Sequence, residues 1–157
     1  MLKKTAKYLE IQPEKFSKMD QTFKFHHIGY ATKSIDKSLT FFVNIGYSAS
    51  IVYIDDIQKV KICTLNNEFG PIIELVEGLD KKESPVSNYI EKIGVTAYHI
   101  CYLVSDIEAA ISKMKQNKFV LLFHPVSAKA FSGRKICYLF NQNVGLIELL
   151  ENEISSI

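Results

Sequence analysis

The stretch that decides the fold is HICYLVSDIE, which runs from His99 to Glu108. A similar stretch, HIGYATKSID, occupies positions 27–36, so that a His, an Ile, a Tyr and a second Ile recur 72 residues apart. Further downstream the correspondence continues at an offset of 74, where KIC at 61–63 returns at 135–137 and IEL at 73–75 returns at 147–149. These pairs indicate an internal duplication of a unit of about seventy residues, a period too long for a solenoid repeat.

Each copy of this unit has one His near its beginning and one Glu near its end. The first copy supplies His27 and Glu74, and the second supplies His99 and Glu148. A two-fold arrangement of the copies would bring the four side chains together. A single His on a strand is commonly a core residue, but four ligand-type residues at equivalent positions favour a metal site. Imidazole and carboxylate donors suit Zn, Ni, Co, Mn or Fe(II) rather than an ion that prefers thiolates.

The hydrophobic pattern predicts the same order of elements in both copies. Side-chain alternation over 23–32 predicts a strand, and the helix that follows begins after Ser34 and ends before Gly46. The remaining expected elements are strands at 47–54, 58–65, 71–77, 97–104, 119–126, 134–140 and 145–150, and helices at 86–93 and 106–117. The order βαβββ, occurring twice, predicts an α+β fold with helices on one side of a curved sheet.

Alternation along the expected strands makes two predictions about the ligand-type residues. His27 shares a face with the small residues Gly29 and Ala31, so we expect room beside it for a bound group and expect His26 to point the other way. Glu74 shares a face with apolar neighbours. A buried carboxylate without a partner is costly, so this side chain is expected to have a specific role.

Composition narrows the class of protein. Charged residues make up 23% of the chain and hydrophobic residues 47%, as in soluble globular proteins. A net charge of +2 without a basic stripe gives no support for a nucleic-acid partner. No apolar run reaches 18 residues, so no membrane span is expected and a cytoplasmic location follows by default.

The three Cys form no CxxC pair, which predicts buried reduced thiols. Residues 1–22 form an extension outside the duplication, and a homodimer is the default assembly.

The paired βαβββ units, with their His-Ile openings and Ile-Glu-Leu endings, resemble the vicinal oxygen chelate superfamily over residues 23–151. Its two modules would cover 23–80 and 95–151. Within that superfamily the chain is most similar to methylmalonyl-CoA epimerases, through the motifs ESPV at 83–86, YHIC at 98–101 and GLIEL at 145–149. The resemblance implies a cupped eight-stranded mixed sheet around one divalent metal, with two positions of its octahedral shell left open. The implied metal ligands are His27, Glu74, His99 and Glu148.

The resemblance also implies an activity. A divalent-metal-dependent epimerase or isomerase would remove the proton next to an acyl-thioester carbonyl, in a substrate such as an acyl-CoA, through a metal-stabilised enolate. Glu148 is the expected first acid/base group. Similar epimerases carry a glutamate where this chain has DDIQK at 55–59, so Asp56 becomes the candidate for the second. The expected substrate-binding residues lie beside the mouth of the pocket and are His124, Ser132 and Arg134.

Two alternatives stay open at this point. Glu74 stands where epimerases have Gln, and a glutamate there favours a lyase like glyoxalase I, which acts on lactoylglutathione. The missing glutamate near Asp56 favours a non-catalytic module that binds a small ligand. An Fe(II) dioxygenase fits less well, because a fourth protein ligand would take up an open coordination position.

Overall fold

A computed structural model describes residues 22–80 and 84–152. The first half runs β1 (Lys24–Thr32), α1 (Ile35–Asn44), β2 (Ser48–Ala49), β3 (Tyr53–Asp55), β4 (Val60–Asn66) and β5 (Ile72–Gly78). Helix α2 (Pro85–Ile93) leads to the second half, which consists of β6 (Thr96–Val104), α3 (Ile107–Gln116), β7 (Val120–Leu121), β8 (Val126–Ser127), the 3-10 helix η2 (Lys129–Phe131), β9 (Lys135–Asn141) and β10 (Gly145–Glu151). The extension predicted for residues 1–22 lies, except for Thr22, outside the described residues.

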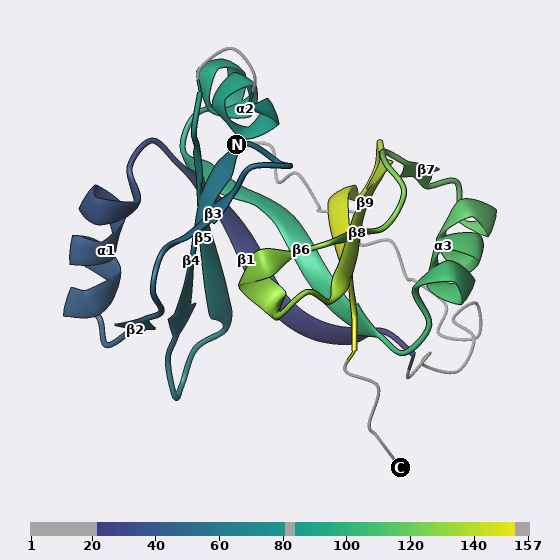
Figure 1. Cartoon of the computed structure of the whole chain (residues 1–157), viewed down its shortest axis with the longest axis horizontal. Helices are drawn as coiled ribbons and strands as arrows, with labels where there is room; N and C mark the ends of the chain where they lie inside the picture. The colour runs from purple at the N-terminus through teal and green to yellow at the C-terminus, as the bar shows by residue number, and fades with distance from the viewer. Residues whose placement is uncertain (1–21, 81–83, 153–157) are drawn as a thin grey trace, which may run out of the picture.

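The strands form one mixed sheet in the order β2-β4-β5-β1-β6-β10-β9-β7, with β3 also paired to β4 and β8 to β9. At its centre β1 and β6 run antiparallel, while β5 lies parallel to β1 and β10 lies parallel to β6. Figure 1 shows β1 and β6 as long diagonal strands that join the β3–β5 side to the β8–β9 side. Helices α1 and α3 lie at the two outer ends. The predicted α+β class, with a mixed sheet and helices outside, is confirmed.

The sheet has ten strands where eight were expected, because two of the predicted strands are each divided. The stretch 47–54 forms β2 and β3, separated at Ser50, whose Oγ accepts the amide N–H of Thr64 at 3.0 Å in place of a backbone carbonyl. The stretch 119–126 forms β7 and β8, separated by residues that include Pro125, which has no N–H to donate to a neighbouring strand. Local side-chain chemistry therefore interrupts both strands.

The outer face of the sheet packs against the two long helices. Ser34 caps α1 by accepting the Lys37 amide, and Ile35 of that helix packs in a buried cluster with residues of β4 and β5. Asp106 caps α3 in the same way through the Ala109 amide, and α3 covers residues of β9 and β10. Because β5 turns Leu75 toward α1, its neighbour Glu74 faces the other side of the sheet. The core packing thus directs the candidate ligands inward.

The three cysteines are free and buried, as predicted. Burial raises the pKa of Cys63 and brings that of Cys137 to about 12, so both thiols stay protonated at neutral pH. Among the residues that the structure describes, no helix is both long enough and apolar enough to span a membrane.

Candidate metal centre and cavity

The four predicted ligands come together on the inner face of the central strands. They lie on four adjacent strands, with Glu74 on β5, His27 on β1, His99 on β6 and Glu148 on β10. Pairing across the strands sets their positions, since Gly29 of β1 lies opposite both Glu74 and His99. Cys101 of β6 lies opposite both His27 and Glu148. Each of these two small residues is therefore flanked by the Glu of its own half and the His of the other half.

The donor atoms of the cluster surround one point. His27 Nε2 lies 3.1 Å from His99 Nε2, 3.1 Å from Glu148 Oε2 and 3.5 Å from Glu74 Oε2. His99 Nε2 lies 3.2 Å from Glu148 Oε2 and 3.7 Å from Glu74 Oε2. An ion with ligand bonds of about 2.1 Å places adjacent donors roughly 3 Å apart. The distances therefore fit four ligands around one cation.

A second observation also fits a divalent metal. Several buried polar atoms of the cluster have no hydrogen-bond partner. All four side chains are at most 3% exposed, so water does not satisfy them. Even so, Glu74 Oε1, His99 Nδ1 and Glu148 Oε2 have no hydrogen-bond partner. Glu148 Oε2 is close to both imidazole nitrogens, but these contacts lack the direction of a hydrogen bond. Buried polar atoms without partners are costly, and a cation at the centre of the cluster would remove that cost for Glu148 Oε2, which faces the Nε2 atoms of both histidines.

The charges of the cluster act strongly on one another. Burial by itself would lower the pKa of His27, but the nearby carboxylates of Glu74 and Glu148 outweigh it and raise that pKa to about 10. Burial likewise opposes the charge of Glu148, yet the close contacts with His27 and His99 and their positive charges hold its pKa well below the usual value. Without a metal, a proton on imidazole therefore takes the cation's place between the carboxylates.

Gly29 makes the approach of His99 possible. The position of a Cβ on Gly29 would lie 1.9–2.2 Å from three ring atoms of His99, a separation that real Cβ atoms do not show. The space beside His27 that was expected to receive a bound group is therefore filled by the His99 ring. The small residue on β1 does leave room, but this room is taken by a candidate ligand from the neighbouring strand, not by a bound group.

His26 does not point away from His27, because β1 has a bulge at this residue. Phe25 pairs with Tyr102 and His27 with Cys101, which leaves His26 as an extra residue in the strand. Its Nδ1 lies 2.7 Å from His27 Nδ1. Burial, followed by the positive charges of His27 and Arg134, lowers the pKa of His26 to about 4, so this ring is neutral at physiological pH.

A second bulge occurs at the equivalent position of β6. Gly29 pairs with His99 and Tyr30 with Ala97, so that Tyr98 is the extra residue. The bulge turns the Tyr98 side chain into a cavity instead of leaving it on the face opposite His99. Burial, and then the charges of Glu74 and Glu148, raise the pKa of Tyr98, so its phenol stays neutral. His26 and Tyr98, which precede the two candidate ligand histidines, are therefore both bulge residues whose side chains depart from the regular alternation of the strand.

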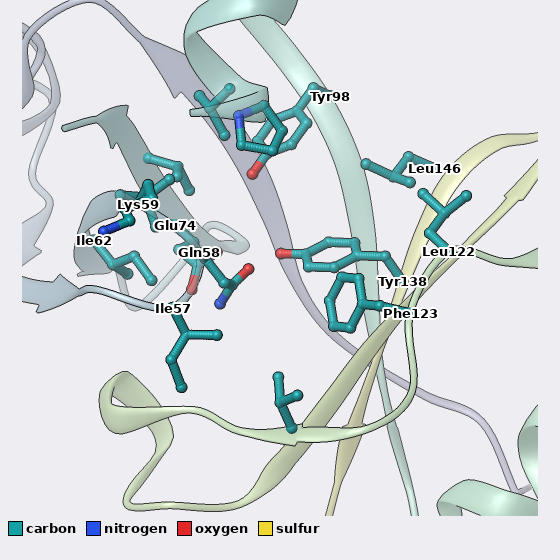
Figure 2. Close-up of a pocket in the computed structure, with 15 residues that line it drawn as sticks. Ile57, Gln58, Lys59, Ile62, Glu74, Tyr98, Leu122, Phe123, Tyr138 and Leu146 are labelled. Carbon is teal, nitrogen blue, oxygen red and sulfur yellow. The ribbon is translucent and has the colours of Figure 1, made fainter. Parts of the chain in front are cut away.

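A cavity of about 490 Å³ opens beside the cluster. Glu74 lines it, and Figure 2 shows the hydroxyl groups of Tyr98 and Tyr138 directed into it, with Gln58 opposite Tyr138. Lys59 is the cation among the described lining residues. Most of the wall is apolar, formed by side chains that include Ile57, Val60, Ile62, Val76, Leu122, Phe123 and Leu146. This volume suits a small molecule with an apolar part.

The other predicted site residues lie away from the walls of this cavity. Asp56 is exposed and lies 3.6 Å from the ammonium group of Lys129. Asp55 beside it is buried and accepts the amides of residues 57 and 58, which makes it a turn-forming residue. His124 and Ser132 are exposed. The Arg134 guanidinium bonds the carbonyl oxygen of Phe131 and lies over that ring.

The sequence argument missed the tyrosines and Gln58. Tyr138 sits on the inner face of β9, where alternation along the predicted strand at 134–140 could have placed it. Gln58 belongs to the DDIQK segment in which Asp56 was chosen, and within that segment Gln58, not Asp56, lines the cavity. No pattern in the sequence signals Tyr98, because its orientation depends on the bulge.

The fold and the buried His/Glu cluster define a paired βαβββ protein with a candidate divalent-metal centre. A family model of the Glyoxalase/Bleomycin resistance protein/Dioxygenase superfamily matches residues 26–138, and the chain belongs to this superfamily. The predicted vicinal oxygen chelate resemblance is thereby confirmed.

The chain is also similar to individual proteins. The chain is 24% identical over 131 residues to the uncharacterized protein YqjC of Bacillus subtilis (strain 168), covering 82% of this chain and 91% of the relative. A hypothetical protein, BH1468 from Bacillus halodurans C-125, matches with a TM-score of 0.76 and 28% identity, over 87% of this chain and 99% of that one. Methylmalonyl-CoA epimerase from Mycobacterium tuberculosis matches with a TM-score of 0.72 and 21% identity, over 81% and 86%.

Proposed function

We propose that this protein is a divalent-metal-dependent epimerase or isomerase that moves the proton next to the carbonyl of an acyl thioester. The observation that carries the proposal is the buried cluster of His27, Glu74, His99 and Glu148, which opens through Glu74 onto a largely apolar cavity. A divalent cation held by these four residues would act as a Lewis acid toward the carbonyl oxygen and make the adjacent C–H bond more acidic. The name of the epimerase neighbour supports a CoA thioester as the substrate class.

The proposed roles combine what the family resemblance implies, which is the source of the role given to Glu148, with the positions of the residues in the structure. Glu148 is the proposed first acid/base group. Inversion of a centre needs a second group on the opposite face, and Asp56 is directed at Lys129 instead of the cavity. Glu74 has an oxygen atom without a partner and lines the cavity, so we assign the second proton transfer to Glu74. The neutral phenols of Tyr98 and Tyr138 are placed to donate hydrogen bonds to the thioester or the acyl group.

Metal content and proton exchange test the proposal together. We expect about one divalent ion per chain after purification or reconstitution, and metal-dependent exchange of the α-proton of acyl-CoA thioesters with D₂O, followed by NMR. Thioesters with apolar acyl groups are expected to exchange faster than those with a charged end, because the cavity wall is mainly apolar. A metal-loaded protein that exchanges none of a panel of thioesters would contradict the proposal and favour a ligand-binding module.

A glyoxalase I-like lyase is the second candidate, because Glu74 completes an all-protein set of two imidazoles and two carboxylates. The assay for it is conversion of the hemithioacetal of methylglyoxal and glutathione into a thioester, followed by absorbance. Conversion of this hemithioacetal without exchange in acyl-CoA substrates would select the lyase over the epimerase.

Metal affinity is expected to rise with pH. The metal-free protein holds a proton on His27 up to about pH 10, whereas a metal ligand must be a neutral imidazole. Binding therefore displaces one proton, and the association constant should increase about tenfold per pH unit between pH 6.5 and 9. Chelator competition measured across that range checks the slope. A slope of zero would mean that His27 either carries no proton in the metal-free protein or does not bind the metal.

A further inference from the structure

The hydrogen bond between His26 and His27 has only one arrangement of protons that suits a metal at the cluster. His27 Nε2 faces His99, Glu74 and Glu148, so this nitrogen is the one that would bind the cation. A neutral metal-binding imidazole then carries its proton on Nδ1. Since Nδ1 of His27 lies 2.7 Å from Nδ1 of His26, the latter nitrogen must accept.

We infer that His26 is a positioning residue for the metal site: its Nδ1 accepts the Nδ1–H of His27 and thereby fixes the tautomer and ring orientation of that ligand. This inference rests on the proposed metal centre. Ligand histidines in metal sites characteristically donate their other N–H to an acceptor, and loss of that acceptor weakens metal binding 10–100-fold. A carboxylate or a carbonyl oxygen commonly accepts this bond, so a second imidazole is an unusual choice of partner.

The surroundings of His26 support an acceptor role. The ring of His27 is stacked on Phe131 with 19° between the planes, and the ring of His26 meets the same phenyl ring edge-on. Both imidazoles therefore contact one aromatic side chain, and the Arg134 side chain donates to the carbonyl oxygen of the same Phe131 and lies over its ring. The β1 bulge brings His26 to the inner side of the strand, where a regular strand would have turned it away.

The two halves differ at this point. Tyr98 occupies the equivalent bulge position before His99, but its hydroxyl is directed into the cavity, and Nδ1 of His99 has no hydrogen-bond partner. The ring orientation of His27 is therefore better fixed than that of His99, the other proposed imidazole ligand. Substitutions at His26 should act on metal binding through His27 alone.

A competing reading makes His26 a ligand of a second ion, because His26, His27 and Cys101 also lie close together. His27 Nδ1 already bonds with His26, so it is not free to bind a second ion. This feature disfavours a second ion, and the stoichiometry of binding separates the two readings.

Two substitutions of His26 test the inference in the full chain, with Co²⁺ as the probe. His26→Phe keeps a ring of similar size but removes the acceptor, and we expect Co²⁺ to bind 10–100-fold more weakly in chelator competition. In His26→Asn, Oδ1 can occupy the place of Nδ1, and affinity should stay within about threefold of wild type. His124→Phe is the matched control at an exposed histidine and should leave affinity unchanged.

The absorption spectrum of bound Co²⁺ and the NMR signal of the His27 Nδ1 proton provide readouts beyond folding. Both should change in His26→Phe and return toward wild type in His26→Asn. Wild-type affinity in His26→Phe, or an equal loss in both variants, would overturn the inference while leaving the metal centre intact. Two Co²⁺ per wild-type chain, with one lost in His26→Phe, would make His26 a ligand instead. A wild-type chain that binds no Co²⁺ would contradict the proposed function as well.

Discussion

Glu148→Gln is expected to abolish epimerisation, and with it α-proton exchange of the substrate enantiomer whose proton faces Glu148, while leaving the fold in place. The substitution keeps the shape of the side chain and an oxygen that can bind a metal, but the amide cannot take up a proton. Loss of a general acid/base group costs about 10²–10⁴ in rate. The same substitution at Glu74 should slow one direction of proton transfer more than the other, since the two carboxylates are assigned to opposite faces of the substrate centre.

The measurement must separate proton transfer from metal loss. Removing a buried negative charge from beside two imidazoles also weakens the hold on a cation, so rates are to be compared at saturating metal. Glu151→Gln is the matched control, because it replaces a carboxylate at the end of the same strand, away from the cluster. Undiminished exchange of the enantiomer whose proton faces Glu148, in the metal-saturated Glu148→Gln variant, would remove Glu148 from the reaction and leave it a ligand alone.

The four candidate ligands could be predicted from the sequence because their positions follow from two simple regularities. Side chains alternate along a strand, so His27 and Glu74 could each be assigned to a face. The recurrence of a His and a Glu in each half then suggested that they meet. Both inferences depend on local spacing and on symmetry, which a sequence displays directly.

The parts that were missed depend on departures from that regularity. An extra residue in one strand of a pair reverses the expected orientation of the side chain it carries, and this occurs at both His26 and Tyr98. Nothing in the composition of either stretch marks a bulge. Likewise, the choice between Asp56 and Gln58 for the cavity wall depends on how the turn at Asp55 closes, which requires the coordinates of that turn.

Only part of the role of Gly29 could be predicted from the sequence, for a related reason. A small residue next to a ligand indicates space, but the sequence does not say which group will fill that space. Antiparallel pairing of β1 with β6 places the His99 ring directly over Gly29, with Glu74 opposite on the other side. The glycine is therefore part of how the ligands approach one another, although it carries no functional group.

Gly29→Ala adds only one methyl group, yet it is expected to disrupt the proposed metal centre strongly. The added methyl group would overlap the His99 ring, and neither side can move easily because both lie on central strands. Overpacking of this kind costs about 1–3 kcal/mol of stability. Displacing a ligand ring should also weaken metal binding by more than the 10–100-fold that loss of an outer-shell partner costs. Denaturant unfolding of the metal-free protein and chelator competition measure the two effects separately.

The double variant Gly29→Ala/His99→Ala shows whether the clash with His99 is the cause. If it is, removing the ring should relieve the overlap, so that the double variant is more stable than the sum of the single changes predicts, by about 0.5–3 kcal/mol. Metal binding should not recover, because a ligand is missing. A purely additive result would mean that the methyl group strains the β1 backbone instead. Wild-type metal affinity in Gly29→Ala would show that His99 has another way to reach the cation, and would leave the close approach at Gly29 without a role in assembling the site.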